Sequence, residues 1–302
     1  MVDVCLLGTG GMMPLPQRRL TALLVRIQGK MILIDCGEGT QVGVKLAGWG
    51  FKEIEAIAFT HYHADHAAGL PGLLLTLANS GKTDPLMLLG PPGLCRVVAG
   101  LSVLAPALPF DLLLTELPDD ALFEGRIGDA FLRSIPADHR MPCLSYSLEV
   151  KRSGRFDARK AGELGIPLEF WHRLQKGETI LHYGKQFEPE MVVGKPRKGI
   201  KIAYCTDTRP TDGLIDFCRD SDLFICEGIY GEDEKLAGAI EKKHMIFSEA
   251  AALAKKSGVR ELWLTHYSPA LKDPEAFTGV AQGIFPNSVP GRDLMTKTLH
   301  FE

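Results

Sequence analysis

Three histidines and one aspartate lie within six residues of the sequence: His61, His63, Asp65 and His66 in the stretch THYHADH. In an extended segment, side chains two residues apart point to the same side, so His61 and His63 can bind one ion. Asp65 and His66 follow on a turn and face a neighbouring position. Imidazole nitrogen and carboxylate oxygen suit zinc, with manganese or iron as alternatives. We therefore predict a metal site rather than a set of surface histidines.

Three further residues of the same chemical kinds follow at large distances along the chain. His139 lies in IPADHRMP, Asp207 in YCTDTRP and His266 in WLTHYS. The carboxylate of Asp207 can bridge two metal ions, because it has two oxygens that accept independently. His244, in KKHMIFSEAA, comes just before a predicted helix. There it can either reach the same site or lie on the surface.

Strand-like apolar runs precede three of these candidate ligands and must position them. The runs occupy residues 56–60, 200–206 and 261–265. Helical patterns alternate with the strands, at 70–81, 211–221 and 248–258. Alternating strands and helices predict an α/β sandwich with helices on its outer faces. Ligands that follow strand ends in such a fold converge on one edge of the sheet.

The charge of the chain is unevenly distributed. Its 302 residues carry a net charge of −3, which argues against a surface that coats nucleic acid. Residues 151–198, however, contain eleven Lys/Arg and six Asp/Glu, so this segment carries +5 and the rest of the chain −8. The segment also interrupts the alternation of strands and helices, and it contains a hairpin-like stretch. We interpret it as an insertion that contacts phosphates or, alternatively, as a solvated excursion.

The terminus and the cysteines predict the cellular compartment. The N-terminus has no basic segment and no cleavage-site pattern, and no apolar stretch approaches the roughly 20 residues that span a bilayer. The seven cysteines are scattered, and none forms a Cys-x-x-Cys pair. Four of them, Cys5, Cys36, Cys205 and Cys226, lie in apolar runs, as reduced buried thiols do. These features predict a cytoplasmic protein without a cysteine zinc site.

Several motifs together resemble the metallo-β-lactamase superfamily and, within it, the ribonuclease Z branch. They are LLGTGG at the N-terminus, LIDCGEGTQ at 33–41, THYHADHAAGLPGLL at 60–74, CTDTRP at 205–210, CEGIY at 226–230, KHMIFSEAA and LTHYSPAL. The resemblance covers nearly the whole chain. It implies a four-layer αββα sandwich in which residues 1–302 form a single domain and residues 151–198 an inserted substrate-binding arm.

The resemblance also implies a site with two zinc ions, for which manganese or iron are possible substitutes. One ion would be bound by His61, His63 and His139, and the other by Asp65, His66 and His266. Asp207 would bridge the two. Such a pair of metals suits phosphodiester hydrolysis, because it lowers the pKa of a shared water and offsets the charge of the attacked phosphate.

The same resemblance assigns roles around the metals. Asp35 would orient a ligand histidine through a hydrogen bond, and Asp65 would also steer the nucleophile. Glu227 and His244 would protonate the leaving oxygen. The implied RNA contacts lie in the arm, at Arg152, Arg155, Arg159 and Lys160. The Gly-Pro motif of the family's arm is absent, and Phe170 and Trp171 take its place.

The activity implied by the resemblance is endonucleolytic 3′-end processing of precursor tRNA by a homodimer, leaving a 3′-hydroxyl. One alternative is a phosphodiesterase on the same scaffold that acts on small or cyclic nucleotide esters. A second, from a different class, is a metal-free RNA-binding or scaffolding protein. The complete histidine and aspartate cluster argues against the second alternative.

Overall fold

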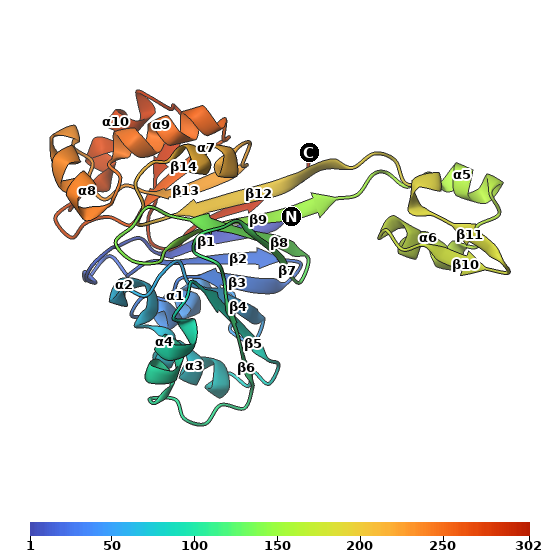
Figure 1. Cartoon of the computed structure of the whole chain (residues 1–302), viewed down its shortest axis with the longest axis horizontal. Coiled ribbons are helices and arrows are strands. Elements are labelled where there is room, and N and C mark those ends of the chain that lie inside the picture. Colours follow the sequence, from blue (N-terminus) through green and yellow to red (C-terminus); the bar gives the residue numbers. More distant parts are fainter. The chain divides into compact units, whose positions relative to one another are not determined.

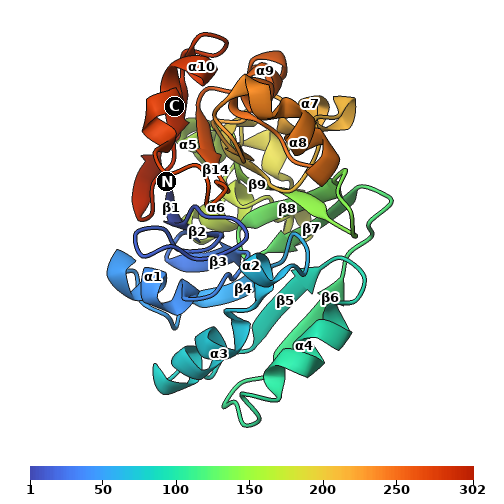
Figure 2. The same cartoon turned by 90° about the vertical axis from the view of Figure 1, so that its left-hand side faces the viewer.

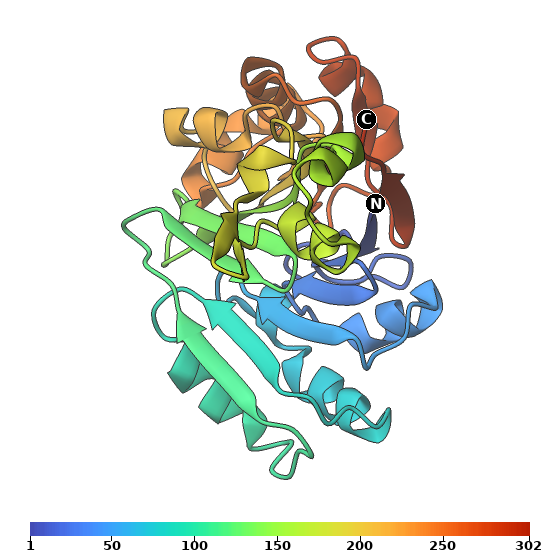
Figure 3. The ribbon, with the colours of Figure 1, turned by 90° about the vertical axis from the view of Figure 1, so that its right-hand side faces the viewer.

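The computed structural model describes residues 1–302. The chain divides into two compact units. Unit 1 comprises Met1–Glu149 and Lys201–His300, and unit 2 comprises Val150–Ile200 with Phe301–Glu302. Most of unit 2 is the yellow-green ribbon of Figures 1 and 3.

The first of two seven-stranded sheets gathers strands from both ends of the chain. Its N-terminal strands and the last strand pair antiparallel, whereas β3 to β6 run parallel to one another. In spatial order the strands are β16 (Met295–Leu299), β1 (Val2–Gly8), β2 (Ala22–Ile27), β3 (Lys30–Ile34), β4 (Ile54–Ala58), β5 (Leu86–Gly90) and β6 (Leu112–Glu116).

The second sheet is built mainly from the later part of the chain. Strands β12 to β15 run parallel, and β7 to β9 form an antiparallel meander. In spatial order the strands are β15 (Ser288–Pro290), β14 (Leu262–Thr265), β13 (Leu223–Glu227), β12 (Arg197–Cys205), β9 (Leu144–Arg152), β8 (Ala130–Pro136) and β7 (Phe123–Ile127).

Helices cover the outer face of each sheet, so unit 1 has the four layers implied by the resemblance (Figures 1 and 2). On the first sheet these are α1 (Thr40–Ala47), α3 (Leu70–Asn79) and α4 (Leu94–Ser102), and the short α2 (Ala64–Ala67) lies at the ends of the strands (Figure 2). On the second they are α7 (Asp212–Cys218), α8 (Leu236–Lys242), α9 (Phe247–Ser257) and α10 (Thr278–Gln282), with 3₁₀ turns at Asp233–Lys235 and Pro274–Phe277.

The apolar face of α3 shows why this layering follows from the sequence. Leu70, Leu73, Leu74 and Leu77 recur at helical spacing, and all four are buried in one cluster with residues of the first sheet. Helix α9 packs in the same way on the second sheet, where Ala250 and Ala254 belong to its core cluster. The helix that follows the histidine and aspartate motif therefore packs on the core of the first sheet.

Unit 2 has a small core of its own. It contains α5 (Ala158–Glu163), α6 (Leu168–Gln175), a 3₁₀ turn at Pro189–Met191 and the predicted hairpin, formed by β10 (Ile180–His182) and β11 (Lys185–Phe187). Phe170 and Trp171 pack against its buried cluster, and the Trp171 indole donates a hydrogen bond to the Ile166 carbonyl at 2.9 Å. These two aromatic side chains thus stabilise the unit internally.

All seven cysteines are free thiols, and only Cys95 is exposed. The structure has no helix that combines the length and the apolar character needed to cross a membrane.

Candidate metal centre

Five of the seven predicted ligands in unit 1 lie on loops at the ends of strands, and Asp65 and His66 lie on the short helix α2. His61 follows β4 on the first sheet, while Asp207 follows β12 and His266 follows β14 on the second. His139 lies in the connection between β8 and β9. The carboxyl ends of parallel strands meet at the same edge of a sheet, which brings side chains from distant parts of the sequence together.

Three residues that lie just after strands have a left-handed backbone. The φ angles are 61° at Asp35, 54° at Asp207 and 59° at His266. Residues with a side chain rarely adopt this region, and aspartate tolerates it better than histidine. Backbone strain of this kind persists where surrounding contacts fix the conformation, and it is concentrated at functional sites.

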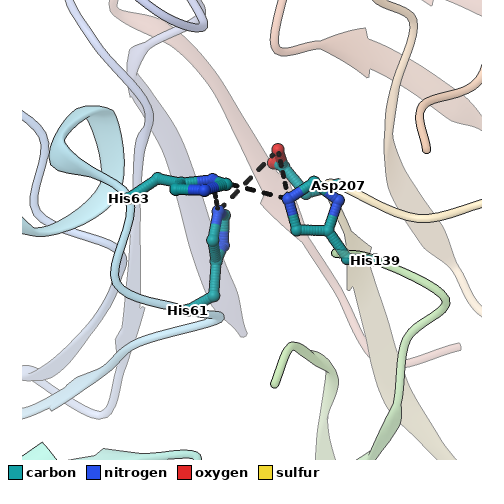
Figure 4. Close-up of side chains that lie close together, drawn as sticks. All are labelled: His61, His63, His139 and Asp207. Atoms are coloured by element: carbon teal, nitrogen blue, oxygen red, sulfur yellow. Dashed lines mark hydrogen bonds and ion pairs between the residues drawn. The ribbon is translucent and has the colours of Figure 1, made fainter. Parts of the chain in front are cut away.

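The first ligand group consists of His61, His63, His139 and Asp207, whose ligand atoms lie within 4.8 Å of one another. Their side chains point toward a common centre in Figure 4. His61 Nε2 lies 2.8 Å from His63 Nδ1, and His139 Nε2 lies 3.4 Å from the same atom. Asp207 Oδ1 is 3.8 Å from both His61 Nε2 and His139 Nε2.

The second group, Asp65, His66 and His266, lies on the other side of the Asp207 carboxylate. His66 Nε2 and His266 Nε2 are 3.1 Å apart. Asp65 Oδ2 lies 3.6 Å from the former nitrogen and 3.4 Å from the latter. Asp207 Oδ2 is 3.1 Å from His66 Nε2 and 3.2 Å from His266 Nε2, so one carboxylate faces both groups.

The chemistry of these donors fits a divalent cation. Asp207 Oδ2 is buried, yet no group donates a well-directed hydrogen bond to it, although two imidazole nitrogens are near. Burial lowers the pKa of His139 to about 4, and burial together with His66 holds the pKa of His61 well below its ordinary value. Neutral imidazoles beside a carboxylate are the form in which these residues bind metal.

Asp35 connects the second group to the protein behind it. Its carboxylate is fully buried and accepts hydrogen bonds from the Thr60 amide at 2.8 Å and from the Thr60 hydroxyl. Asp35 Oδ2 also lies 2.9 Å from His66 Nδ1. A carboxylate in this position holds the proton on Nδ1 and leaves the lone pair of Nε2 directed into the site.

Glu227 and His244 form a hydrogen-bonded pair next to the ligand groups. His244 Nδ1 lies 2.8 Å from Glu227 Oε2, and the other Glu227 oxygen accepts from the Thr208 amide at 2.6 Å. Burial by itself would lower the pKa of His244, but the Glu227 carboxylate raises it to about 9. His244 also lies near Asp207 and His266, in a group that can hold a cation.

The structure adds residues that the sequence did not single out. Arg209 lies two residues after Asp207 and binds the Glu249 carboxylate, with Nη1 2.9 Å from Oε2. The same guanidinium donates to the carbonyl of His244, and so joins the loop of Asp207 to that of His244. In the sequence, the only indication of this role was that an arginine lies two residues after the predicted ligand Asp207.

Gly11 explains part of the N-terminal glycine motif. A Cβ atom at this position would lie 2.7 Å from Cε1 of the His266 ring, which is closer than real contacts allow. The next residue, Met12, donates its amide to Asp65 Oδ2 at 2.6 Å. The loop after β1 therefore packs directly on the second ligand group, and only glycine fits against the imidazole.

The four predicted RNA contacts belong to unit 2 and are not part of the metal centre. Arg155, Arg159 and Lys160 are exposed. Arg159 forms an exposed ion pair with Glu163 at 3.4 Å. The Arg152 guanidinium lies 5.2 Å from the ring of Phe301, which belongs to the same unit.

Curated proteins match this chain from end to end. Ribonuclease Z of Clostridium kluyveri is 52% identical over 302 residues, which are 100% of both chains. Ribonuclease Z of Clostridium acetobutylicum is 53% identical over 309 residues, covering 100% of this chain and 99% of the relative. Residues 2–95 also match a family model described as anti-Pycsar protein Apyc1.

Solved structures share the fold. The short form of human tRNase Z matches with a TM-score of 0.71 and 24% identity, over 99% of this chain and 100% of that chain. The metallo-β-lactamase fold protein YhfI from Bacillus subtilis matches with a TM-score of 0.70 and 17% identity, over 98% of each chain. The predicted αββα metallo-β-lactamase sandwich is therefore confirmed.

Replacing Asp35 by asparagine is expected to weaken zinc binding about 10- to 100-fold, because the amide no longer fixes the His66 tautomer. Competition with a chromophoric chelator, after removal of bound metal, measures the affinity. Asp212→Asn, which changes an exposed carboxylate on α7, is the matched control and should bind like the original protein. Equal affinity in Asp35→Asn and the control would contradict the orienting role.

Proposed function

Since the chain belongs to the ribonuclease Z family, we propose that it is a metal-dependent endonuclease that removes the 3′ trailer of precursor tRNA and leaves a 3′-hydroxyl. The observation that carries this proposal is the meeting of two histidine and aspartate groups at the single carboxylate of Asp207. Relatives that are more than half identical over the whole chain, and are named ribonuclease Z, support the choice of reaction.

The donor set suits two zinc ions in each subunit, with manganese or iron as possible substitutes. His61, His63 and His139 would hold one ion, Asp65, His66 and His266 the other, and Asp207 would contact both. When bound, the metals lower the pKa of a water molecule and offset negative charge on the attacked phosphate. Asp65 Oδ2 is fixed by the Met12 amide, so this carboxylate can also direct the attacking water.

The Glu227 and His244 pair would supply the proton that the leaving oxygen needs. Breaking the P–O3′ bond produces an alkoxide, which is a poor leaving group unless it is protonated. With its pKa raised to about 9, His244 carries a proton at neutral pH. Glu227 stabilises that imidazolium and is itself held by the Thr208 amide.

Residues 151–198 would act as the arm that binds the RNA. The segment carries a net charge of +5 on an otherwise acidic chain. Lys and Arg contacts to phosphates supply most of the affinity of proteins for nucleic acids. Arg152, Arg155, Arg159 and Lys160 are the proposed contacts.

We also propose that the protein is a homodimer in the cytoplasm. The edge strand β6 exposes Leu113 and Leu114, with exposed fractions of 50% and 37%. An apolar strand at the edge of a sheet offers a surface on which a second copy can pack. The seven free thiols suit a reducing compartment.

The proposed reaction is tested by offering the protein precursor tRNA and bis-p-nitrophenyl phosphate in parallel, each with a chelator control. Both substrates should be turned over, and the chelator should stop both reactions. Between 50 and 200 mM salt, cleavage of the RNA should fall by about 10³-fold or more if six phosphates are contacted, while turnover of the small ester should barely change. Turnover of the ester without any cleavage of the RNA would favour a small-ester phosphodiesterase instead.

Deleting residues 155–195 should spare turnover of the small ester and abolish processing of precursor tRNA. The deletion can be closed with a short glycine and serine link, because the Gly194 amide lies 2.9 Å from the Arg155 carbonyl and the two ends are therefore adjacent. Kinetics on both substrates measure the effect. An equal loss on both substrates would show that the segment is needed for the fold rather than for docking RNA.

The pH dependence of cleavage should have an alkaline limb set by His244. A proton donor is active below its pKa, so activity should fall as the pH rises through about 9. Glu227→Gln removes the carboxylate that raises this pKa, and the limb should move to lower pH. The exposed Glu241→Gln on α8 is the control and should leave the profile in place. An unmoved limb in Glu227→Gln would exclude the pair as the proton donor.

A further inference from the structure

The hairpin of unit 2 ends in an aromatic side chain that is almost fully exposed. Tyr183 has an exposed fraction of 96%, the highest among the exposed large apolar side chains of the chain. It lies at the turn between β10 and β11, whose register pairs Ile180 with Phe187 and His182 with Lys185. Ile180 and Phe187 are buried in the core of the unit, so the core anchors the strands while the tip projects into solvent.

The backbone at the tip does not favour a tyrosine. The φ angles of the two turn residues are 46° at Tyr183 and 73° at Gly184, as in a two-residue type I′ turn. Asparagine, aspartate or glycine are preferred at the first of these positions, because bulky side chains fit a left-handed backbone poorly. The tyrosine therefore does not serve the turn, and an exposed ring on a strained backbone is the kind of feature that marks a functional position.

The Tyr183 ring is the outer end of a series of neighbouring rings. The Tyr183 and His182 ring centroids are 4.3 Å apart at an angle of 61°, and those of His182 and Phe170 are 4.9 Å apart at 63°. Phe170 packs against the buried cluster of unit 2. The outermost ring thus meets its neighbour in an edge contact and exposes nearly all of its surface.

The charge of the surrounding segment identifies the kind of partner. Residues 151–198 carry a net charge of +5, which favours a polyanion. Within the hairpin, Lys185 lies opposite His182. Aromatic rings on positively charged surfaces bind single-stranded nucleic acid by stacking on bases, because every base has a flat face.

We propose that the Tyr183 ring stacks on an unpaired or terminal base of the precursor tRNA. This inference rests on the proposed RNA substrate, and it adds a base contact to the phosphate contacts of the arm. Stacking on a base does not depend on ion release, whereas phosphate contacts do. The contribution of Tyr183 should therefore be the same at low and high salt.

The test compares Tyr183→Ala, Tyr183→Asn and Tyr183→Trp in the full-length, metal-loaded protein, with Leu181→Ala as the matched control. Leu181 is on the same hairpin and is 74% exposed, but it is aliphatic. Tyr183→Ala should raise the KM for precursor tRNA about 5- to 100-fold, with a much smaller change in kcat. Tyr183→Trp should keep a KM near that of the original protein, and Leu181→Ala should change KM less than twofold.

Tyr183→Asn separates stacking from a purely structural role. Asparagine suits the left-handed turn, so the hairpin should be at least as stable as with tyrosine, which thermal unfolding can verify. We expect the same rise in KM as for Tyr183→Ala, and a ratio to the original KM that is constant between 50 and 200 mM salt. By contrast, Arg155→Ala should make binding less sensitive to salt.

Three results would overturn the inference. A normal KM in Tyr183→Asn would show that the ring makes no contact with RNA. An equally large effect in Leu181→Ala would indicate a general apolar contact, and an altered sedimentation coefficient of Tyr183→Ala would assign the ring to a contact between subunits. If the original protein does not cleave precursor tRNA at all, the proposed function fails first. If the original protein cleaves precursor tRNA and Tyr183→Ala has the same KM for it, only the proposed stacking contact is wrong.

Discussion

The carboxylate of Asp207 is the group on which the site depends, because both histidine groups meet at it. Its Oδ1 lies 3.8 Å from His61 Nε2, and its Oδ2 lies 3.1 Å from His66 Nε2. A buried carboxylate is costly unless opposite charge or hydrogen bonds compensate it. The compensating imidazoles come from segments that follow strands of both sheets, so the sandwich has to be assembled before the site exists.

Residues behind the ligands keep this arrangement fixed. Asp35 holds the His66 ring, Gly11 leaves room for the His266 ring, and Arg209 joins the Asp207 loop to the His244 loop. Asp35, Asp207 and His266 also share a left-handed backbone, which these surroundings must hold in place. Preorganisation of this kind is what hydrolysis requires, since charge and proton donors have to be in position before the substrate arrives.

The chain divides chemistry and charge between its two units. Unit 1 contains every group that faces Asp207, and unit 2 contains the basic segment 151–198 with a small core of its own. The basic segment carries a net charge of +5, whereas the remainder of the chain carries −8. In the proposed function, unit 2 would supply affinity for the RNA while unit 1 carries out the cleavage.

The sequence by itself indicated an α/β sandwich and candidate ligands through periodicity and spacing, while the four layers and the two ligand groups were implied by the resemblance of its motifs. The leucines of α3 and the polar residues after β4, β12 and β14 are visible without a structure. Only the tertiary structure decided which side chains support them. The pairing of Arg209 with Glu249, the packing of Trp171 on the core of unit 2 and the exposure of Tyr183 depend on contacts made in three dimensions. Periodicity indicates which face of an element is buried, but it does not specify the neighbour on that face.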